Sequence, residues 1–92
     1  MKAFSFSSIM AHVYLLYSES LDKFYIGHTA LDPTERLQKH LSNHDGFTAK
    51  AKDWKIVFTK EFETKALAYA EERRLKKLKS KTTLKKLAGF GT

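Results

Sequence analysis

Two short apolar and aromatic runs, separated by a few turn-forming residues, constrain the fold of this chain more than any other feature. Residues 12–18, centred on Val13-Tyr14-Leu15-Leu16-Tyr17, have the composition of a β-strand. Residues 23–26 predict a second strand that ends at Gly27, and residues 18–22 between the two runs are turn-like. Because so short a connection leaves no room for a crossover, the sequence predicts an antiparallel hairpin.

The residues that follow the hairpin predict a helix with a well-marked beginning. Asp32-Pro33-Thr34-Glu35 places a side-chain acceptor at the N-cap, a proline at the first helical position and a carboxylate at the third. This is a capping-box pattern. The helix should run to about Ser42, with Leu37 and Leu41 facing inward.

The second half of the chain predicts one strand and two further helices. Residues 54–59 alternate as a strand does, after a polar loop at 47–53. Thr64 can cap a helix that runs to about Lys79. The buried side of that helix is expected to consist of Leu67, Ala68, Leu75 and Leu78. A last helix, its glycine stop and a loose tail are expected at residues 82–88, 89 and 90–92. The order β-β-α-β-α-α indicates an α+β fold.

Length and composition favour one domain without covalent cross-links. The 92 residues leave no room for a second core, and the absence of cysteine excludes disulfides and thiolate zinc sites. No segment has the ~20 apolar residues needed to span a bilayer, and the first ten residues do not resemble a signal peptide. We therefore expect a single cytoplasmic domain over residues 1–92, not bound to a membrane. Residues 1–10 should be a frayed extension and residues 81–92 a basic helix and tail.

The positive charge of the chain is concentrated near its C-terminal end. The net charge is +7, and the sixteen residues from Glu71 to Lys86 contain eight Lys and Arg against two Glu. Such a stripe suits the phosphate backbone of a nucleic acid, which releases counterions when it is neutralised. A solvated, lysine-rich helix face explains the charge equally well.

One candidate for chemistry is a pair of residues on the first predicted helix. Arg36 and His40 lie one turn apart and share a face, outside the line of the inward leucines. An arginine there could clamp a phosphate with two hydrogen bonds. Spacing alone favours the alternative, a surface arginine whose stem packs over an aromatic ring.

A second candidate is the acidic pair Glu71-Glu72, which is followed at once by Arg73-Arg74. A carboxylate inside a basic surface weakens nucleic-acid binding unless it holds a divalent cation. An ordinary helical ion pair, for instance between Glu72 and Lys76, is the simpler explanation of the spacing taken alone.

Five sequence blocks in a fixed order combine these observations. They are His12-Val13-Tyr14, Tyr25-Ile26-Gly27 with His28-Thr29, Glu35 to His40, Phe47-Thr48 with Trp54 to Phe58, and Thr64 to Lys76. Together they resemble the GIY-YIG nuclease superfamily. The branch they resemble most is the small bacterial single-domain one, related to the nuclease module of the excision-repair incision subunit. The resemblance covers about residues 11–80, the expected core of the domain.

This resemblance implies a central three-stranded antiparallel sheet flanked by helices. It also implies hydrolysis of phosphodiester bonds with one divalent cation, Mg²⁺ or Mn²⁺. By position, it assigns catalytic roles to Tyr14, Tyr25, Arg36, His40 and Glu72. Glu72 would bind the metal and Arg36 would neutralise the phosphate. The tyrosines, with His40, would activate and orient the attacking water.

The resemblance and the basic stripe also suggest residues that bind substrate. Gly27 would let the backbone approach the phosphate closely, and His28 would lie near it. The full expected set is Gly27, His28, Arg73, Arg74, Lys76 and Lys77. The choice of glutamate stays open, because Glu71 is nearer the middle of the predicted apolar stripe whereas the resemblance favours Glu72.

The leading hypothesis is therefore a metal-dependent endonuclease that acts on DNA, with structured or damaged DNA as candidate substrates. The alternative is a nucleic-acid-binding module that keeps the fold without turnover. A third class, an adaptor for a protein partner, draws only on the exposed basic helix. The oligomeric state is not readable from the sequence.

Overall fold

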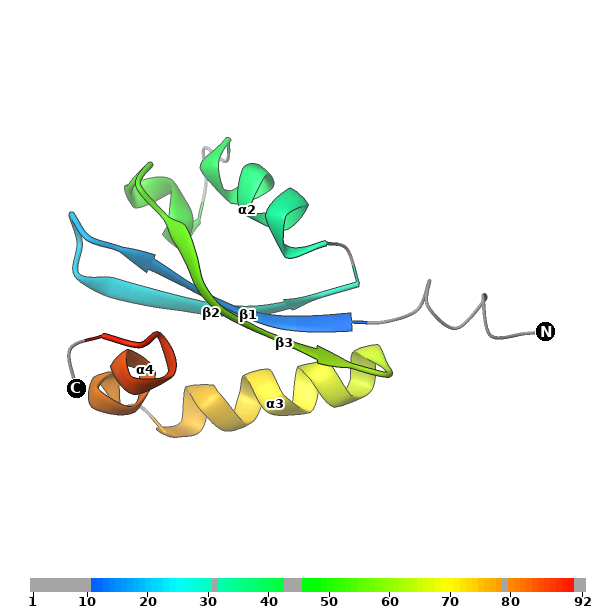
Figure 1. Ribbon diagram of the computed structural model, residues 1–92. Helices are drawn as coiled ribbons and strands as arrows, with labels where there is room; N and C mark the ends of the chain where they lie inside the picture. The colour runs from blue at the N-terminus through cyan, green and yellow to red at the C-terminus, as the bar shows by residue number, and fades with distance from the viewer. Residues whose placement is uncertain (1–10, 31, 43–45, 79, 91–92) are drawn as a thin grey trace.

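The computed structural model describes residues 11–30, 32–42, 46–78 and 80–90. Its three strands, β1 (Ala11–Ser18), β2 (Lys23–Thr29) and β3 (Lys55–Phe62), form one antiparallel sheet in the order β2-β1-β3 (Figure 1). The helices are α2 (Pro33–Leu41), the short 3-10 turn η1 (Phe47–Lys50), α3 (Lys65–Leu78) and α4 (Lys81–Leu87). The predicted α+β class and the central antiparallel sheet are confirmed. The predicted frayed extension at residues 1–10 lies outside the described residues.

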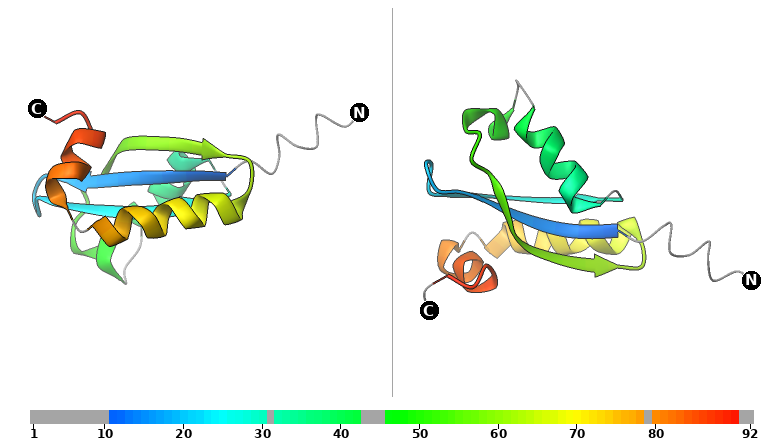
Figure 2. Two further views of the ribbon diagram at one scale, coloured as in Figure 1. Left: turned by 90° about the horizontal axis from the view of Figure 1, so that it is seen from below. Right: turned by 45° about the horizontal axis from the view of Figure 1, so that its top comes forward.

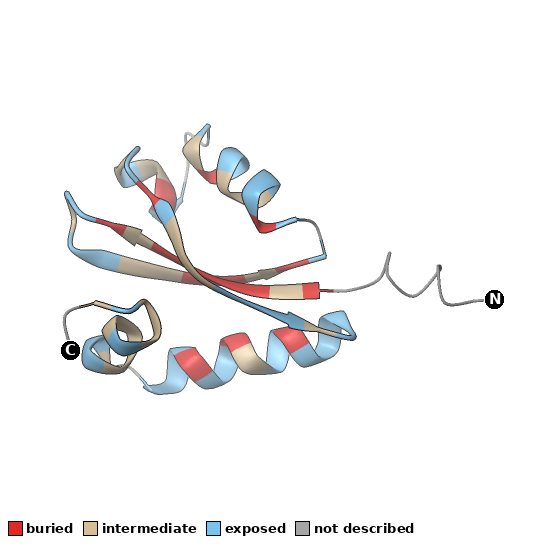
Figure 3. Ribbon diagram, viewed as in Figure 1, coloured by how far each residue is buried: buried red, intermediate tan, exposed pale blue. Residues whose placement is uncertain are grey.

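The sheet separates two apolar clusters. Helix α2 lies over one face, and α3 and α4 lie over the other (Figures 1 and 2). Alternate residues of β1 point to opposite faces. Val13 and Leu15 pack with Ala68 and Leu75 of α3, whereas Tyr14 packs with Trp54 on the α2 side. Figure 3 shows that β1, the central strand, is the most continuously buried element. Because β1 is central, β2 is left as an edge strand.

Strand β2 does not end at Gly27, as its sequence suggested, but continues to Thr29. Gly27 pairs with Tyr14 of β1, and the Tyr14 ring lies directly over it. A Cβ atom at position 27 would lie 2.6 Å from Tyr14 Cζ and closer still to Tyr14 Oη. Glycine here makes room for a neighbouring side chain inside a strand, so it does not mark the end of that strand.

Helix α2 and the segment before β3 differ in detail from the prediction. Asp32 is the N-cap of α2 and Pro33 its first residue, as expected, but the Asp32 side chain makes no capping hydrogen bond. The polar loop predicted at residues 47–53 contains η1, in which Thr48 is buried. Trp54 precedes β3 instead of starting it; its indole N–H donates to the Thr48 carbonyl at 3.0 Å and so ties the loop to the core.

Helix α3 begins where it was predicted, and Ala68 and Leu75 are buried as expected, but the other two predicted inward residues are not. Thr64 caps it, since its hydroxyl accepts from the Leu67 N–H at 3.1 Å. Leu67 and Leu78, expected inside, are 50% and 42% exposed. The buried positions of α3 are Ala68, Glu72 and Leu75, which follow the i, i+4, i+7 spacing of one helix face. A carboxylate therefore lies in the middle of the inward stripe.

The C-terminal part of the chain is more firmly attached than the predicted loose tail. Gly89 stops α4 with φ of +80°, and the Phe90 N–H donates to the Lys85 carbonyl at 2.9 Å. The Phe90 ring packs edge-on against Tyr17, with ring centroids 4.9 Å apart. Lys81, at the start of α4, binds Asp22 in the hairpin turn at 2.6 Å. Helix α4 is thus joined to the β1–β2 hairpin at both ends. No helix in the described ranges is long and apolar enough to cross a bilayer.

Candidate active site

Strand β1 and helix α2 bring Tyr14 and His40 into contact. Tyr14 is 1% exposed, and its Oη lies 2.9 Å from His40 Nε2. His40 is in the last turn of α2, and its Nδ1 lies 3.1 Å from the Thr48 hydroxyl of η1. Thr48 is itself fixed by Trp54 through the carbonyl contact described above. The imidazole is therefore held at both nitrogens.

Arg36, one turn before His40 on α2, acts on both members of this pair. Burial raises the pKa of Tyr14, and a hydrogen bond from Arg36, together with its charge, opposes that rise. Burial, followed by the positive charge of Arg36, lowers the pKa of His40 below 6.5. At neutral pH the pair is consequently a protonated phenol beside an uncharged imidazole.

Tyr25 completes this side of the site. It lies on β2, two residues before Gly27, and its ring centroid is 4.8 Å from that of His40 and 6.4 Å from that of Tyr14. The structure thus brings together four predicted site residues: Tyr14, Tyr25, Arg36 and His40. The sequence had placed only Arg36 and His40 side by side.

On the other face of the sheet, Glu72 is a buried carboxylate held by two bases. It is 8% exposed, and its Oε1 lies 2.5 Å from Nδ1 of His28 on β2. Its Oε2 accepts from Lys76 Nζ at 2.6 Å. The helical ion pair that spacing suggested is therefore present. His28 adds a contact from the sheet that spacing along the helix could not indicate.

Glu71 has a different environment from its neighbour. It forms a two-point ion pair with Arg74, at 2.8 and 2.7 Å, and this pairing lowers its pKa. The expectation that Glu71 lies nearer the buried stripe is wrong, because the stripe runs through Glu72 and not through Leu67 and Leu78. Of the two glutamates, only Glu72 faces the sheet and lines the pocket described next.

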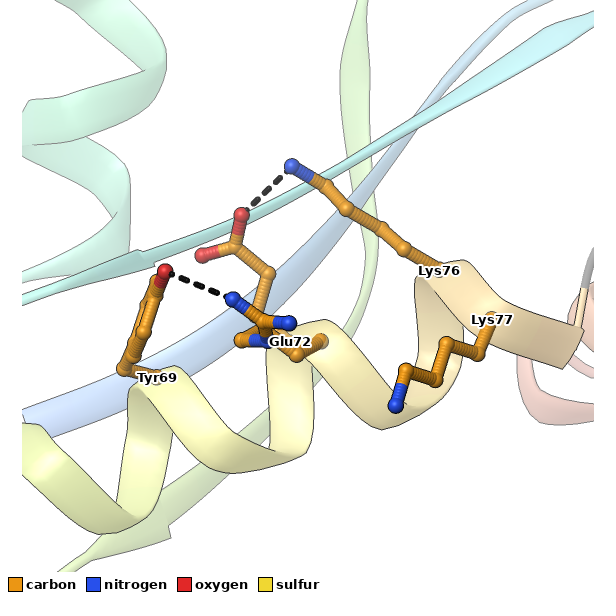
Figure 4. Close-up of a pocket in the computed structure, with 5 residues that line it drawn as sticks. Tyr69, Glu72, Lys76 and Lys77 are labelled. Carbon is orange, nitrogen blue, oxygen red and sulfur yellow. Dashed lines mark hydrogen bonds and ion pairs between the residues drawn. The ribbon is translucent and has the colours of Figure 1, made fainter.

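A pocket of about 320 Å³ opens beside Glu72 (Figure 4). Its walls are Tyr69, Glu72, Arg73, Lys76 and Lys77. Arg73 donates to the Tyr69 hydroxyl at 3.3 Å, and its guanidinium lies over the Tyr69 ring at 5.7 Å. Three of the four predicted basic residues thus surround the carboxylate. Arg74 is paired with Glu71 and is not among the residues of the pocket wall.

Strand β2 lies between these two groups of residues. On the α2 side of the sheet, the Tyr14 ring extends across β2 at Gly27. His28, the residue after Gly27, contacts Glu72 on the α3 side. The negative charge of Glu72 is near enough to contribute to the raised pKa of Tyr14. We therefore treat both groups as one site, called the β2-edge site below, formed by Tyr14, Tyr25, His28, Arg36, His40 and Glu72.

The donor set of this site limits how it could hold a metal. In the described part of the chain, no three His, Asp or Glu side chains form a group able to bind a metal ion. A single carboxylate suits Mg²⁺, which keeps several waters and is commonly bound by one or two carboxylates and a substrate phosphate. Glu72 fits that requirement once Lys76 or His28 releases one of its oxygens.

Two residues that contact or adjoin the site were missed by reasoning from the sequence. Thr48 holds His40, but it was noted only as part of a sequence block and given no role. Tyr69 falls within the last sequence block but was likewise given no role; it is 47% exposed and lines the pocket. Its spacing of three residues from Glu72 and four from Arg73 was the available signal, because such residues are neighbours on a helix surface.

Comparison with known families agrees with this geometry. The family model of the GIY-YIG catalytic domain matches residues 10–86, most of the chain, and every residue of the β2-edge site lies within that range. The chain therefore belongs to the GIY-YIG family, whose fold is of the nuclease type. Comparisons with curated proteins and with solved structures gave no significant match.

Proposed function

We propose that this chain is a metal-dependent endonuclease that hydrolyses phosphodiester bonds in DNA through the β2-edge site. The observation that carries the proposal is Glu72, a buried carboxylate facing a pocket whose other charged residues are all basic. Burying a carboxylate costs free energy unless the carboxylate is paired. A negative charge among the basic residues also weakens the binding of a polyanion, so a carboxylate at this position is expected to have a function of its own. The family match supports hydrolysis as that function.

Glu72 is the residue that would hold a divalent cation, Mg²⁺ or Mn²⁺. When bound, the cation supplies Lewis-acid stabilisation of the negative charge that builds on the phosphate oxygens. Lys76 and His28 orient the carboxylate before substrate arrives. Arg36, on the opposite side of β2, would neutralise the same phosphate, since a guanidinium can donate two parallel hydrogen bonds to its oxygens.

Proton transfer from the attacking water would use Tyr14 and His40. Uncharged His40 has one nitrogen free to accept a hydrogen bond, and the contact of Tyr14 Oη with His40 Nε2 suits donation by the phenol. Thr48 would then accept from the Nδ1–H, which fixes that tautomer. As water attacks phosphorus, its proton passes to Tyr14 Oη and the phenol proton to His40. The P–O bond to the leaving group breaks, and the leaving oxygen is protonated by solvent.

The test compares two adjacent glutamates. Glu72→Gln keeps the size and hydrogen-bonding capacity of the side chain but removes its charge. We expect it to lower the rate of Mg²⁺- or Mn²⁺-dependent nicking by at least about 100-fold, the usual scale for loss of electrostatic stabilisation. Glu71→Gln is the matched control, because it removes the same charge one residue away. It should cleave at close to the wild-type rate.

Substrates for this assay should be single-stranded, flap, branched and fully paired DNAs of equal length. Circular dichroism and thermal unfolding of both variants establish that the fold is retained. Equal activity of Glu72→Gln and wild type, or undiminished cleavage in EDTA, would contradict the proposed role of Glu72.

A second function, binding of nucleic acid without turnover, is favoured by one observation. Each oxygen of Glu72 already has a partner in the protein, His28 for Oε1 and Lys76 for Oε2, so the carboxylate does not need a cation to be paired. In that case wild-type protein would bind DNA in a salt-dependent way without cleaving it. Neither divalent cations nor Glu72→Gln would then change the affinity by more than a few-fold.

A further inference from the structure

Tyr69 is a large aromatic residue that the apolar core does not use. It is 47% exposed and lies outside the buried stripe of α3, Ala68-Glu72-Leu75. Neither of the two apolar clusters of the described residues includes it. Because burial of a tyrosine ring is a major source of stability, a half-exposed ring beside a charged pocket calls for another explanation.

The position of the Tyr69 ring is fixed by polar neighbours. Its centroid is 5.2 Å from that of the His28 ring, and Arg73 holds it through the hydroxyl contact and the guanidinium described above. The contact with Arg73 orients the ring in advance (Figure 4). Nearly half of the residue nevertheless remains open to solvent. A fixed, exposed aromatic ring with an arginine beside it is the arrangement that stacks nucleobases in proteins that bind single strands.

Tyr69 also lies close to the residues proposed to act on the phosphate. It precedes Glu72 by three residues, so the two side chains are neighbours on one helix surface, and both line the same pocket. Its ring contacts His28, which contacts Glu72 in turn. A base that stacked on Tyr69 would therefore belong to a nucleotide next to the phosphate at Glu72.

We propose that Tyr69, with Arg73, is a stacking platform for an unpaired nucleobase next to the cleaved phosphate. In a duplex both faces of a base are covered by its neighbours, so only an unpaired or extruded base can offer a face to the ring. The site would thus select DNA with an unpaired nucleotide at the position of cleavage. This inference rests on the proposed function for the location of the phosphate, whereas stacking itself can be measured without turnover.

The experiment measures binding of fluorescently labelled DNA to the full chain in EDTA, with DNA length checked afterwards. The ligands are a single strand, a flap, a fully paired duplex, and a set of single strands with one abasic site moved along the sequence. Tyr69→Ala should weaken binding of the single strand and flap by about 5- to 100-fold, the range expected for loss of one stacked base. Binding of the duplex should change by less than about twofold.

Two variants serve as controls. Tyr69→Phe keeps the ring but loses the hydroxyl that Arg73 contacts, so it should keep most of the single-strand affinity that Tyr69→Ala loses. Leu67→Ala shortens a side chain of the same helix that is exposed to a similar extent, 50%, but does not line the pocket, so it should bind like wild type. For wild type, one abasic position should cost as much affinity as Tyr69→Ala. In the Tyr69→Ala variant the same abasic position should cost nothing further, because both changes remove one interaction.

The inference is overturned if Tyr69→Ala binds all ligands as wild type does. It is also overturned if the loss is equal for intact, abasic and paired DNA, because Tyr69 would then act only by holding Arg73 or His28. A parallel cleavage assay with Mg²⁺ keeps this separate from the proposed function. Stacking without cleavage would contradict the proposed nuclease activity but not the stacking role of Tyr69. Cleavage without stacking would contradict only the stacking role.

Discussion

Gly27 shows how one residue can decide the position of another. Its backbone is ordinary extended strand, so its value does not lie in conformational freedom. It lies in the missing side chain, because a Cβ atom would occupy the space of the Tyr14 phenol. Tyr14 can reach His40 at 2.9 Å only because its ring crosses β2 at this point. The sequence resemblance implied that Gly27 lets the backbone approach the phosphate. The packing indicates a further role, which is to leave room for the Tyr14 ring.

His40 leads to a prediction about pH. Its folded-state pKa is lowered by burial and then by the Arg36 charge, whereas the unfolded chain should have the ordinary value of about 6.5. As pH falls through 6.5 the unfolded state therefore takes up a proton that the folded state resists. This uptake favours unfolding, so stability is lost on acidification. At pH 7.5, above both pKa values, His40 contributes no such loss.

The comparison that isolates this effect is wild type against His40→Gln. Glutamine can still hydrogen-bond Tyr14 but does not titrate. Urea denaturation at pH 7.5 and pH 5 should show a smaller loss of unfolding free energy on acidification for the variant than for wild type. Parallel losses in the two proteins would mean that His40 is not the group responsible.

At the scale of elements, α4 is joined to the hairpin by a small polar and aromatic junction. Phe90 packs on Tyr17 and Phe24, and Lys81 binds Asp22. Asp22 also accepts from the Tyr17 hydroxyl at 2.6 Å, which raises the pKa of Tyr17 to about 12. These contacts connect the last helix with the turn between β1 and β2, which is far from it in sequence.

Phe90→Ala should therefore destabilise the protein, although Phe90 is close to the C-terminal end. We expect a loss of about 1–2 kcal/mol, from partial burial of the ring and two aromatic contacts. Leu78→Ala is the control, since Leu78 is 42% exposed and its truncation should cost less than about 0.5 kcal/mol. Chemical denaturation of both variants gives the comparison, and equal stabilities would show that Phe90 does not anchor α4.

The elements also show which features could be predicted from the sequence. The presence and order of the three strands and the starts of α2 and α3 follow from local patterns, such as Pro33 after Asp32 and the hydroxyl of Thr64, and these were correct. Strand ends were not: β2 continues to Thr29. The inward face of α3 was assigned correctly at Ala68 and Leu75 but wrongly at Leu67 and Leu78, because apolar character was taken as a sign of burial. Leu67 and Leu78 are exposed since the sheet lies along the Ala68–Glu72–Leu75 line.

Contacts between residues far apart in the chain could not be predicted from the sequence. The residues of the Tyr14–His40 pair are 26 positions apart, and those of the His28–Glu72 pair are 44 positions apart. Local spacing carries no information on either. The resemblance supplied the identities of these residues, and the structure supplied their proximity. It also separated Glu72 from Glu71, which spacing had left open.

At the scale of the whole molecule, the net charge of +7 should attract any polyanion. Whether DNA binds at the surface near Glu72 can be tested by removing single charges. Lys77 lines the pocket beside Glu72. If it contacts a phosphate, Lys77→Gln should weaken DNA binding equally for all sequences. It should also reduce the slope of log K against log salt concentration by about 1.

Lys55→Gln is the matched control for this measurement. It removes the same charge from β3, the strand at the opposite edge of the sheet from β2. Titrations of labelled DNA at several salt concentrations should leave its slope close to that of wild type. If the two variants lower the slope equally, binding depends on total charge and not on a surface near Glu72.

The edge position of β2 has a consequence for how access to the site could be blocked. An edge strand presents backbone N–H and C=O groups that another extended chain can pair with. Here that edge also separates Tyr14 and His40 on one side from Glu72 on the other. A peptide that added itself as a fourth strand beside β2 would therefore lie along the strand that carries Tyr25, Gly27 and His28 between the two halves of the site. If the phosphodiester enters at this edge, strand addition should exclude it, and a short β-strand mimic would then act as an inhibitor.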